Sequence, residues 1–169
     1  MPVDNCRYSF EDLVDRVLPV HLKRMQEALN KPHPMILLAK SGVGIAGALK
    51  TLGLYRDFPG SYVLLDGIPI YVGISRTVVA RLIQHVKGKT HYDASLAYRM
   101  AASWYPHEME RDAAMNDADF RAHFDKAKAY LGEMSFAYIE IPSAVERCLF
   151  EVYCALKYDT GKWNTFETH

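Results

Sequence analysis

The sequence has few cysteines, and this shortage narrows the classes of protein that it can encode. Its 169 residues contain three, Cys6, Cys148 and Cys154, and no CxxC pair. An odd number of cysteines without zinc-ligand spacing favours reduced thiols in the cytoplasm over a disulfide framework or a zinc finger. We expect Cys148 and Cys154 to be small core residues.

Long apolar runs and an apolar leader are also lacking. No run approaches the roughly 20 residues of a membrane span. The first residues, MPVDNCRYSFEDL, have no apolar stretch of signal-peptide type. We therefore expect a cytoplasmic protein that does not bind membranes.

A net charge is missing as well, because 20 Lys and Arg balance 20 Asp and Glu. This balance gives no global indication of a nucleic-acid or membrane partner. The charges are nevertheless distributed unevenly. Residues 60–99 hold five basic residues against two acidic ones, and residues 108–140 hold eight acidic against four basic. A neutral chain can therefore still present one basic face, built from Arg76, Arg81, Lys87, Lys89 and Arg99.

The first 57 residues are expected to form an N-terminal helical extension, followed by a main domain over residues 58–169. Residues 9–31 have helical apolar spacing with Ser9 as the N-cap, and Pro19 is expected to bend or end the first part of this helix. The glycine-rich stretch 35–55 fits a short strand, a turn and a helix. It lacks GK[ST] at P-loop spacing, which excludes that phosphate-binding motif.

Two strand-like runs, SYVLL and IPIYVGI, surround the turn signal Asp66-Gly67. Pro69 requires an edge position or a bulge in the second strand. Further on, helices are expected over residues 77–88, from a cap at Asp93, over 117–132 and from a cap at Ser143, with a strand over 134–141. The order β-β-α-α-α-β-α predicts an α+β fold with a small three-stranded antiparallel sheet flanked by helices.

Four residues of this hairpin and the following helix are expected to gather. With a two-residue turn, Tyr62 would face Tyr71 on one side of the sheet. Arg81 and His85 are four residues apart and share a helix face. Gly73, at the junction, allows the backbone to approach a neighbour closely.

An ordered set of residues resembles the GIY-YIG endonuclease superfamily. The set consists of Gly60-Ser61-Tyr62, Tyr71-Val72-Gly73, Arg81, His85, Glu151 and Asn164. The resemblance implies a GIY-YIG-like fold and a metal-dependent endonuclease that hydrolyses phosphodiester bonds, in DNA rather than RNA, with Mg²⁺ or Mn²⁺. It implies five catalytic residues, Tyr62, Tyr71, Arg81, His85 and Glu151, of which Glu151 also binds the metal.

The resemblance also suggests roles for these residues. Tyr71 is the expected base, with Tyr62 hydrogen-bonded beside it, and His85 assists proton transfer or binds phosphate. Arg81 can bind phosphate oxygens bidentately. One Mg²⁺ held by a single carboxylate, waters and phosphate oxygens is a normal arrangement. The expected substrate-binding residues are Gly73, Ser75, Arg76, Lys87, Lys89, His91 and Asn164, of which Asn164 orients the glutamate or closes the site.

Two glutamates of the last helix compete for the metal. Successive residues of a helix are about 100° apart around its axis. On this spacing Glu151 lies on one flank of the apolar stripe of the helix, and Glu146 lies on the far side of the helix from the stripe. A metal ligand needs a partly enclosed position, which favours Glu151. The expected stripe consists of Val145, Cys148, Leu149, Val152, Ala155 and Leu156.

Other interpretations stay open at this point. Two tyrosines in a hairpin are often cross-strand packing, and Arg81 with His85 fits a solvated helix face. Ser61 stands where the superfamily usually has an aliphatic residue. The alternative function is a catalytically inactive nucleic-acid-binding module on the same fold. Residues 1–57 match nothing in the motif, and a homodimer surface or a targeting partner would give them a role.

Overall fold

The computed structural model describes residues 3–166, which form two compact units. The sheet unit comprises the chain up to His33, Arg56–Val78 and the chain from Ser135 onward. The helical unit comprises Pro34–Tyr55 and Val79–Met134. Each unit is described by itself below. The expected boundary between residues 57 and 58 stays a prediction.

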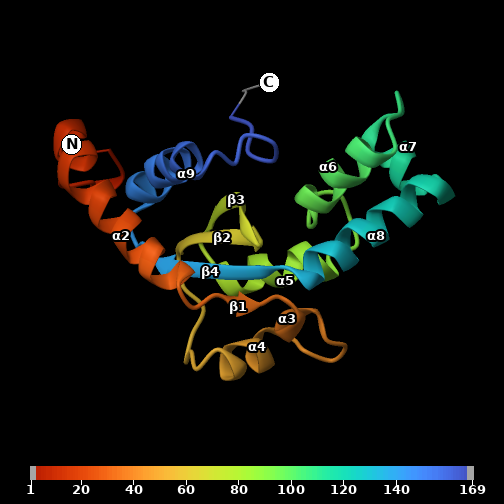
Figure 1. The fold of residues 1–169 in the computed structure, drawn as a ribbon, viewed down its shortest axis with the longest axis horizontal. Helices are drawn as coiled ribbons and strands as arrows, with labels where there is room; N and C mark the ends of the chain where they lie inside the picture. Colours follow the sequence, from red (N-terminus) through yellow and green to blue (C-terminus); the bar gives the residue numbers. More distant parts are fainter. Residues whose placement is uncertain (1–2, 167–169) are drawn as a thin grey trace. The chain divides into compact units, whose positions relative to one another are not determined.

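The sheet has four strands in the order β1-β4-β2-β3, and β2 runs antiparallel to both β3 and β4 (Figure 1). The predicted α+β class and antiparallel sheet are thus confirmed. The sheet has one strand more than expected, because the two-residue β1 is too short to leave a pattern. The strands are β1 (His33–Pro34), β2 (Gly60–Asp66), β3 (Ile68–Ser75) and β4 (Ser135–Glu140).

The register of the β2–β3 hairpin differs from the prediction. Asp66 pairs with Ile68 across Gly67, whose φ of 71° is accessible to glycine. Tyr62 lies opposite Gly73, so the expected direct pair of Tyr62 with Tyr71 is wrong. The tighter turn and an irregularity between Leu64 and Leu65 account for the difference.

The prediction for Pro69 is confirmed on both points. Strand β3 is an edge strand, and the register shifts between Leu65, which pairs with Pro69, and Leu64, which pairs with Tyr71. Proline has no backbone N–H for a sheet ladder, so an edge and a bulge accommodate it.

The N-terminal helix begins at the expected cap. Ser9 accepts a hydrogen bond from the N–H of Asp12, and the Asp12 carboxylate accepts one from the N–H of Ser9. Pro19 does not end the helix, because the preceding turn is a π-helix that relaxes the usual backbone pairing there. The elements are α1 (Phe10–Asp12), the π-turn (Leu13–Val17) and α2 (Leu18–Leu29).

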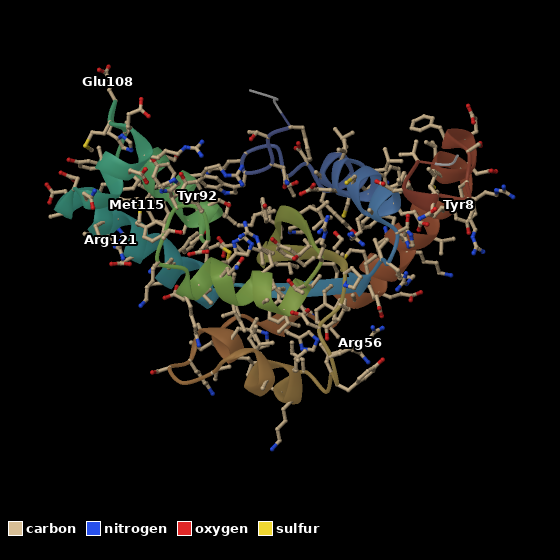
Figure 2. The ribbon with its side chains drawn as sticks, turned by 180° about the vertical axis from the view of Figure 1, so that it is seen from behind. Tyr8, Arg56, Tyr92, Glu108, Met115 and Arg121 are labelled. Carbon is tan, nitrogen blue, oxygen red and sulfur yellow. The ribbon has the colours of Figure 1, made fainter. Side chains whose placement is uncertain are left out.

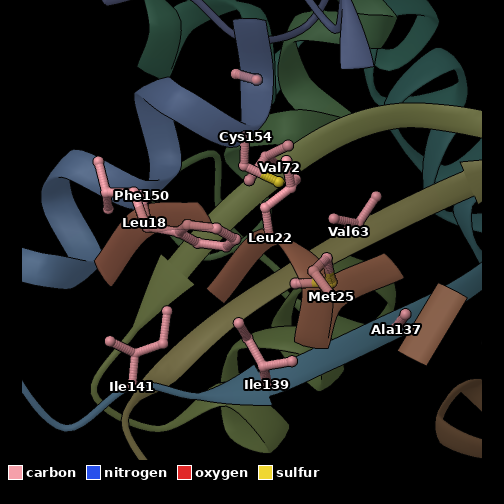
Figure 3. Close-up of a cluster of buried hydrophobic side chains, with 11 residues drawn as sticks. Leu18, Leu22, Met25, Val63, Val72, Ala137, Ile139, Ile141, Phe150 and Cys154 are labelled. Atoms are coloured by element: carbon pink, nitrogen blue, oxygen red, sulfur yellow. The ribbon is translucent and has the colours of Figure 1, made fainter. Parts of the chain in front are cut away.

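Helices α2 and α9 (Ala144–Tyr158) cover one face of the sheet and form a single core with it. Ser143 caps α9 as predicted. Burying a large apolar side chain contributes about 1.5–3 kcal/mol, so this cluster holds α2 firmly to the sheet. Figure 3 shows its members: Leu18, Leu22, Met25, Val63, Val72, Ala137, Ile139, Ile141, Phe150, Cys154 and Ala155.

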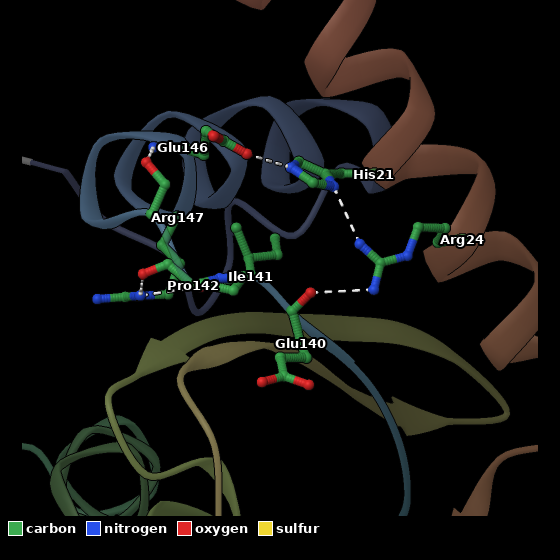
Figure 4. A network of polar contacts seen from close by, with 8 residues as sticks. His21, Arg24, Glu140, Ile141, Pro142, Glu146 and Arg147 are labelled. Atoms are coloured by element: carbon green, nitrogen blue, oxygen red, sulfur yellow. Dashed lines mark hydrogen bonds and ion pairs between the residues drawn. The ribbon is translucent and has the colours of Figure 1, made fainter. Parts of the chain in front are cut away.

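Polar contacts join the same elements beside the core (Figure 4). The His21 imidazole on α2 lies 2.7 Å from the Glu146 carboxylate on α9. Arg24 donates to the carbonyl of Glu140 at 3.0 Å. The buried Arg147 donates to the carbonyls of Ile141 and Pro142, which precede α9.

The helical unit contains the remaining helices, among which α6 and α8 pack side by side (Figure 1). Asp117 caps α8. The expected strand after residue 35 is a helix, and Ala94 rather than Asp93 occupies the N-cap of α6. The helices are α3 (Ile36–Ala39), α4 (Ile45–Thr51), α5 (Val78–Lys87, whose first residue belongs to the sheet unit), α6 (Ser95–Trp104), α7 (Arg111–Asn116) and α8 (Ala118–Glu133). Among the described residues, none of the helices has the length and apolar character needed to cross a membrane.

Candidate functional site

Tyr62 and Tyr71 lie on the same face of the β2–β3 hairpin. They are diagonal neighbours, with ring centroids 6.2 Å apart, and both side chains are buried. Val63 and Val72 alternate with them and point to the opposite face, into the core under α2 and α9. The two phenols therefore share a surface as expected, through a different register.

Gly73 is required by the ring of Tyr62. A Cβ at this position would overlap the end of that ring, which lies over the glycine. The buried hydroxyl of Ser61 donates to the carbonyl of Gly73 at 3.1 Å, so this serine is hydrogen-bonded as well as packed. The close approach predicted at Gly73 is confirmed, and the approaching group is Tyr62.

Asn164 binds the backbone at the open edge of β3. Its amide oxygen accepts from the N–H of Val72 at 2.9 Å, and its amide nitrogen donates to the carbonyl of Val72 at 2.7 Å. Thr160 donates to the same amide oxygen at 2.8 Å and holds the side chain in place. Asn164 thus supplies β3 with the pair of hydrogen bonds that a further strand would make.

Glu151 lies on α9 at the border between buried and exposed residues. The expected apolar stripe of α9 is partly wrong, because Cys148, Val152 and Leu156 are exposed while Arg147 is buried. The core instead receives the face that contains Phe150, Cys154 and Ala155. Glu151 still flanks the buried face, so the expected half-enclosed position holds. Glu146 is engaged with His21.

The donor set for a metal is small. Within residues 3–166, no group of three or more His, Cys, Asp or Glu side chains could hold a metal ion. A closed zinc site would need such a group. A Mg²⁺ or Mn²⁺ ion that keeps most of its waters needs only one or two carboxylates, and Glu151 alone satisfies that minimum.

Arg81 is fixed in the helical unit by contacts to the start of α6. Its guanidinium donates to the carbonyl of Asp93 at 2.7 Å, to the hydroxyl of Ser95 at 3.0 Å and to the side chain of Gln84 at 3.1 Å. These contacts use both terminal nitrogens and hold the planar group in one orientation. A fixed guanidinium is suited to recognising a phosphate.

His85 is completely buried one turn after Arg81. Burial, together with the positive charges of Arg81 and Arg99, lowers the pKa of His85 from 6.5 to about 3. The imidazole is therefore neutral near pH 7. Protonation of the ring near pH 7 is unfavourable, and the imidazole brings no positive charge to a phosphate.

The remaining predicted substrate-binding residues have different surroundings. Lys87 donates to the carbonyls of Lys40 and Val43, at 2.6 Å each, and so ties α5 to the loop after α3. Ser75 is engaged in a local turn, where it donates to the Thr77 carbonyl and accepts from its N–H. The last two, Arg76 and Lys89, are exposed.

His91 is buried between two cavities of the helical unit. One, of about 320 Å³, also contains Ser95, Tyr98, Arg99, Ala102 and Arg111. The other, of about 310 Å³, lies on the side of Lys89, Tyr92 and Arg121. Sequence reasoning assigned no role to Arg111 and Arg121, because their distance along the chain from His91 hides that they line the same cavities. It also assigned none to Tyr92, which directly follows His91.

The predicted site draws on both units. Tyr62, Tyr71, Glu151 and Asn164 belong to the sheet unit, and Arg81, His85, Lys87, Lys89 and His91 belong to the helical unit. The convergence of the catalytic set on one patch stays a prediction. No family model, no curated protein and no solved structure matches the chain.

Proposed function

We propose that the chain is a metal-dependent endonuclease of GIY-YIG type that hydrolyses phosphodiester bonds, in DNA rather than RNA. The observation that carries the proposal is the pair Tyr62 and Tyr71 on one face of the hairpin, with Gly73 beneath the first ring. This pair joins the two halves of the sequence motif in space. Arg81, His85 and Glu151, in the order of the motif, complete the proposed catalytic set.

In this proposal the phenols of Tyr71 and Tyr62 and the imidazole of His85 carry out the proton transfers. Tyr71 takes the proton of the attacking water at its phenolic oxygen, which requires a nearby positive charge that favours the phenolate. Tyr62, whose ring centroid is 6.2 Å from that of Tyr71, orients the base. His85 is neutral near pH 7 because its pKa is lowered to about 3, so its proposed part is to assist proton transfer and not to bind phosphate as a cation.

Arg81 and the metal that Glu151 would hold neutralise the negative charge on the phosphate. Arg81 is held by Asp93 and Ser95, so little reorganisation is needed when a phosphate binds. When bound, Mg²⁺ or Mn²⁺ polarises the phosphate and stabilises the leaving oxygen. Asn164 positions the edge of β3 through Val72, next to Tyr71 in the strand, which makes it a positioning residue.

A second candidate is a catalytically inactive nucleic-acid-binding module. It is favoured by the finding that three motif residues already have structural partners within the chain. Gly73 accommodates Tyr62, Arg81 binds Asp93, and Asn164 binds Val72. These contacts would be kept in a protein that has lost its chemistry.

Cleavage of a labelled substrate panel distinguishes the two functions. The panel contains supercoiled plasmid, linear duplex, branched DNA, single strands and structured RNA, each with Mg²⁺, Mn²⁺ or EDTA. We expect metal-dependent cutting of DNA that Glu151→Gln and Tyr71→Phe each reduce by at least about a hundredfold, as for loss of a catalytic acid or base.

Glu146→Gln is the matched control. It removes a carboxylate from the same helix as Glu151, but this carboxylate is engaged with His21. It should cut DNA at close to the wild-type rate once its folding has been verified by circular dichroism. Binding without cutting by the folded wild-type protein would support the inactive module. Equal loss of cutting in Glu146→Gln and Glu151→Gln would refute the assignment of Glu151.

A further inference from the structure

Cationic side chains line the two cavities that share His91 in the helical unit. Arg99 and Arg111 line the cavity on one side of the imidazole, and Lys89 and Arg121 line the cavity on the other. The residues come from the loop before α6, from α6, from α7 and from α8, so the fold gathers charges that are up to 32 positions apart in the sequence. We refer to the two cavities together as the His91 groove.

The balance of charge in the His91 groove is positive. Its one carboxylate is that of Asp112, whose side chain is 83% exposed and whose oxygen lies 3.6 Å from Nδ1 of His91. The acidic Glu110 acts on Tyr98 from the start of α7, but does not line either cavity. Arg121 also lies 3.8 Å from the exposed carboxylate of Asp125 on its own helix. Four cationic residues against these two carboxylates still leave a positive surface that attracts an anion.

The groove also offers polar and aromatic groups of the kind that bind a nucleic-acid strand. The hydroxyl of Ser95 and the buried imidazole of His91 provide hydrogen-bonding groups on the wall. The ring centroids of Tyr92 and His91 are 3.9 Å apart, and Tyr92 is 73% exposed, which leaves its ring accessible to a base. Figure 2 shows Tyr92 near Met115 and Arg121, which line the same cavity. Cations beside an open aromatic ring are the pattern of strand-binding surfaces.

A hydrogen bond links the groove to the proposed active site. Ser95, which lines the larger cavity, accepts a hydrogen bond from Arg81 at 3.0 Å. A phosphate held by Arg81 and a phosphate held in this cavity would therefore be near neighbours. The cavity volume of about 320 Å³ is ample for a phosphate group and its sugar.

We propose that the His91 groove binds the backbone of a nucleic-acid strand next to the scissile phosphate, with phosphates on Arg99, Arg111 and Arg121 and a base stacked on Tyr92. The proposal rests on the proposed function for the class of ligand. It names a binding surface outside the GIY-YIG motif, built mainly from the helices between α5 and β4.

Binding in EDTA tests the groove separately from cleavage. The probe is a 5′-fluorescein oligonucleotide, as single strand and as duplex, measured by anisotropy over a range of salt concentrations. Removing one cation–phosphate pair should reduce the slope of log K against log salt by about 0.7–0.9. We expect the double variant Arg99→Gln/Arg111→Gln to bind at least about tenfold more weakly with a reduced slope, and Tyr92→Ala to bind more weakly with the slope unchanged.

The matched control is Lys50→Gln/Lys126→Gln, which removes two exposed charges of the same unit outside both cavities. It should bind within about twofold of the wild type. Arg99→Lys/Arg111→Lys keeps the charge and should keep the salt slope, which separates loss of charge from loss of folding. Equal weakening in the groove and control variants would overturn the proposal. It would also be overturned if inorganic phosphate bound in an Arg99- and Arg111-dependent manner while the oligonucleotide did not.

The outcomes separate this proposal from the endonuclease assignment. If the wild-type protein binds strands through the groove and cuts none of them, the groove proposal is supported and the endonuclease proposal is refuted. If the protein cuts DNA and the groove variants bind and cut as the wild type does, the endonuclease proposal is supported and the groove proposal is refuted.

Discussion

The ring of Tyr62 lies over Gly73, the residue directly opposite it on the neighbouring strand. The contact is so close that no side chain can replace the glycine hydrogen without displacing the ring. It ties the tyrosine of one half of the motif to the glycine of the other half.

Gly73→Ala should therefore destabilise the protein by about 1–3 kcal/mol, the usual cost of overpacking a well-filled interior. Urea unfolding followed by circular dichroism measures this change. Gly161→Ala is the matched control, because a Cβ there would have no atom within 4 Å. Equal stability of the two variants would show that the Tyr62 ring moves aside freely.

Asn164→Ala should lower the free energy of unfolding by about 2–3 kcal/mol. The substitution removes two hydrogen bonds to the buried Val72 and leaves its backbone groups without their partner. Thr160→Val removes the hydroxyl that lies 2.8 Å from the Asn164 amide oxygen and 3.5 Å from the Ala155 carbonyl, and should cost about 1 kcal/mol. Hydrogen exchange at the Val72 amide should accelerate in Asn164→Ala, and an unchanged rate would count against this role.

His85 should make the protein less stable in acid. Its pKa is about 3 in the folded chain against 6.5 when unfolded, so between these values the unfolded chain binds a proton that the folded chain does not. The contribution of the neutral His85 to the free energy of unfolding is fully present above pH 6.5. It is lost as the pH falls toward 3, at up to about 1.4 kcal/mol per pH unit.

Urea unfolding at pH 7.5, 6.0 and 4.5 tests this effect by comparison of the wild type with His85→Gln. The variant should lose less stability on acidification, because glutamine does not titrate. His123→Gln, at a half-buried position of α8, is the control and should follow the wild type. Parallel curves for wild type and His85→Gln would contradict the depressed pKa.

The two cysteines of α9 should differ sharply in reactivity. Cys148 is exposed, whereas burial raises the pKa of the Cys154 thiol to about 12 and keeps it protonated and shielded. In a Cys6→Ser background, Ellman's reagent should modify one thiol in the native protein and the second only after denaturation. Rapid modification of both thiols without denaturant would exclude the packing of Cys154 between α9 and the sheet.

The elements with strong local signals could be predicted from the sequence. Ser9 and Ser143 cap helices as predicted, and Pro69 lies at an edge and beside a bulge. These features depend on neighbouring residues alone, so the pattern of the chain was sufficient.

Features set by distant packing could not be predicted in the same way. The exact turn at Gly67 shifted the partner of Tyr62, and the buried face of α9 was rotated away from Cys148 and Val152. Helical periodicity finds the apolar residues of α9, but which of them are buried depends on α2, which contributes Leu22 and Met25 to the same core. The contribution of Arg111 and Arg121 to the His91 groove was equally hidden, since these two residues come from α7 and α8.

The hydrogen bonds between Asn164 and Val72 also have a consequence for the behaviour of the protein at high concentration. Strand β3 is a sheet edge, and a bare edge is a template on which a second chain can add a strand and begin to aggregate. Here Pro69 offers no donor, the neighbouring bulge interrupts the ladder, and the Asn164 amide occupies the groups of Val72. The residue that completes the motif thereby also closes the edge against the growth of intermolecular sheets.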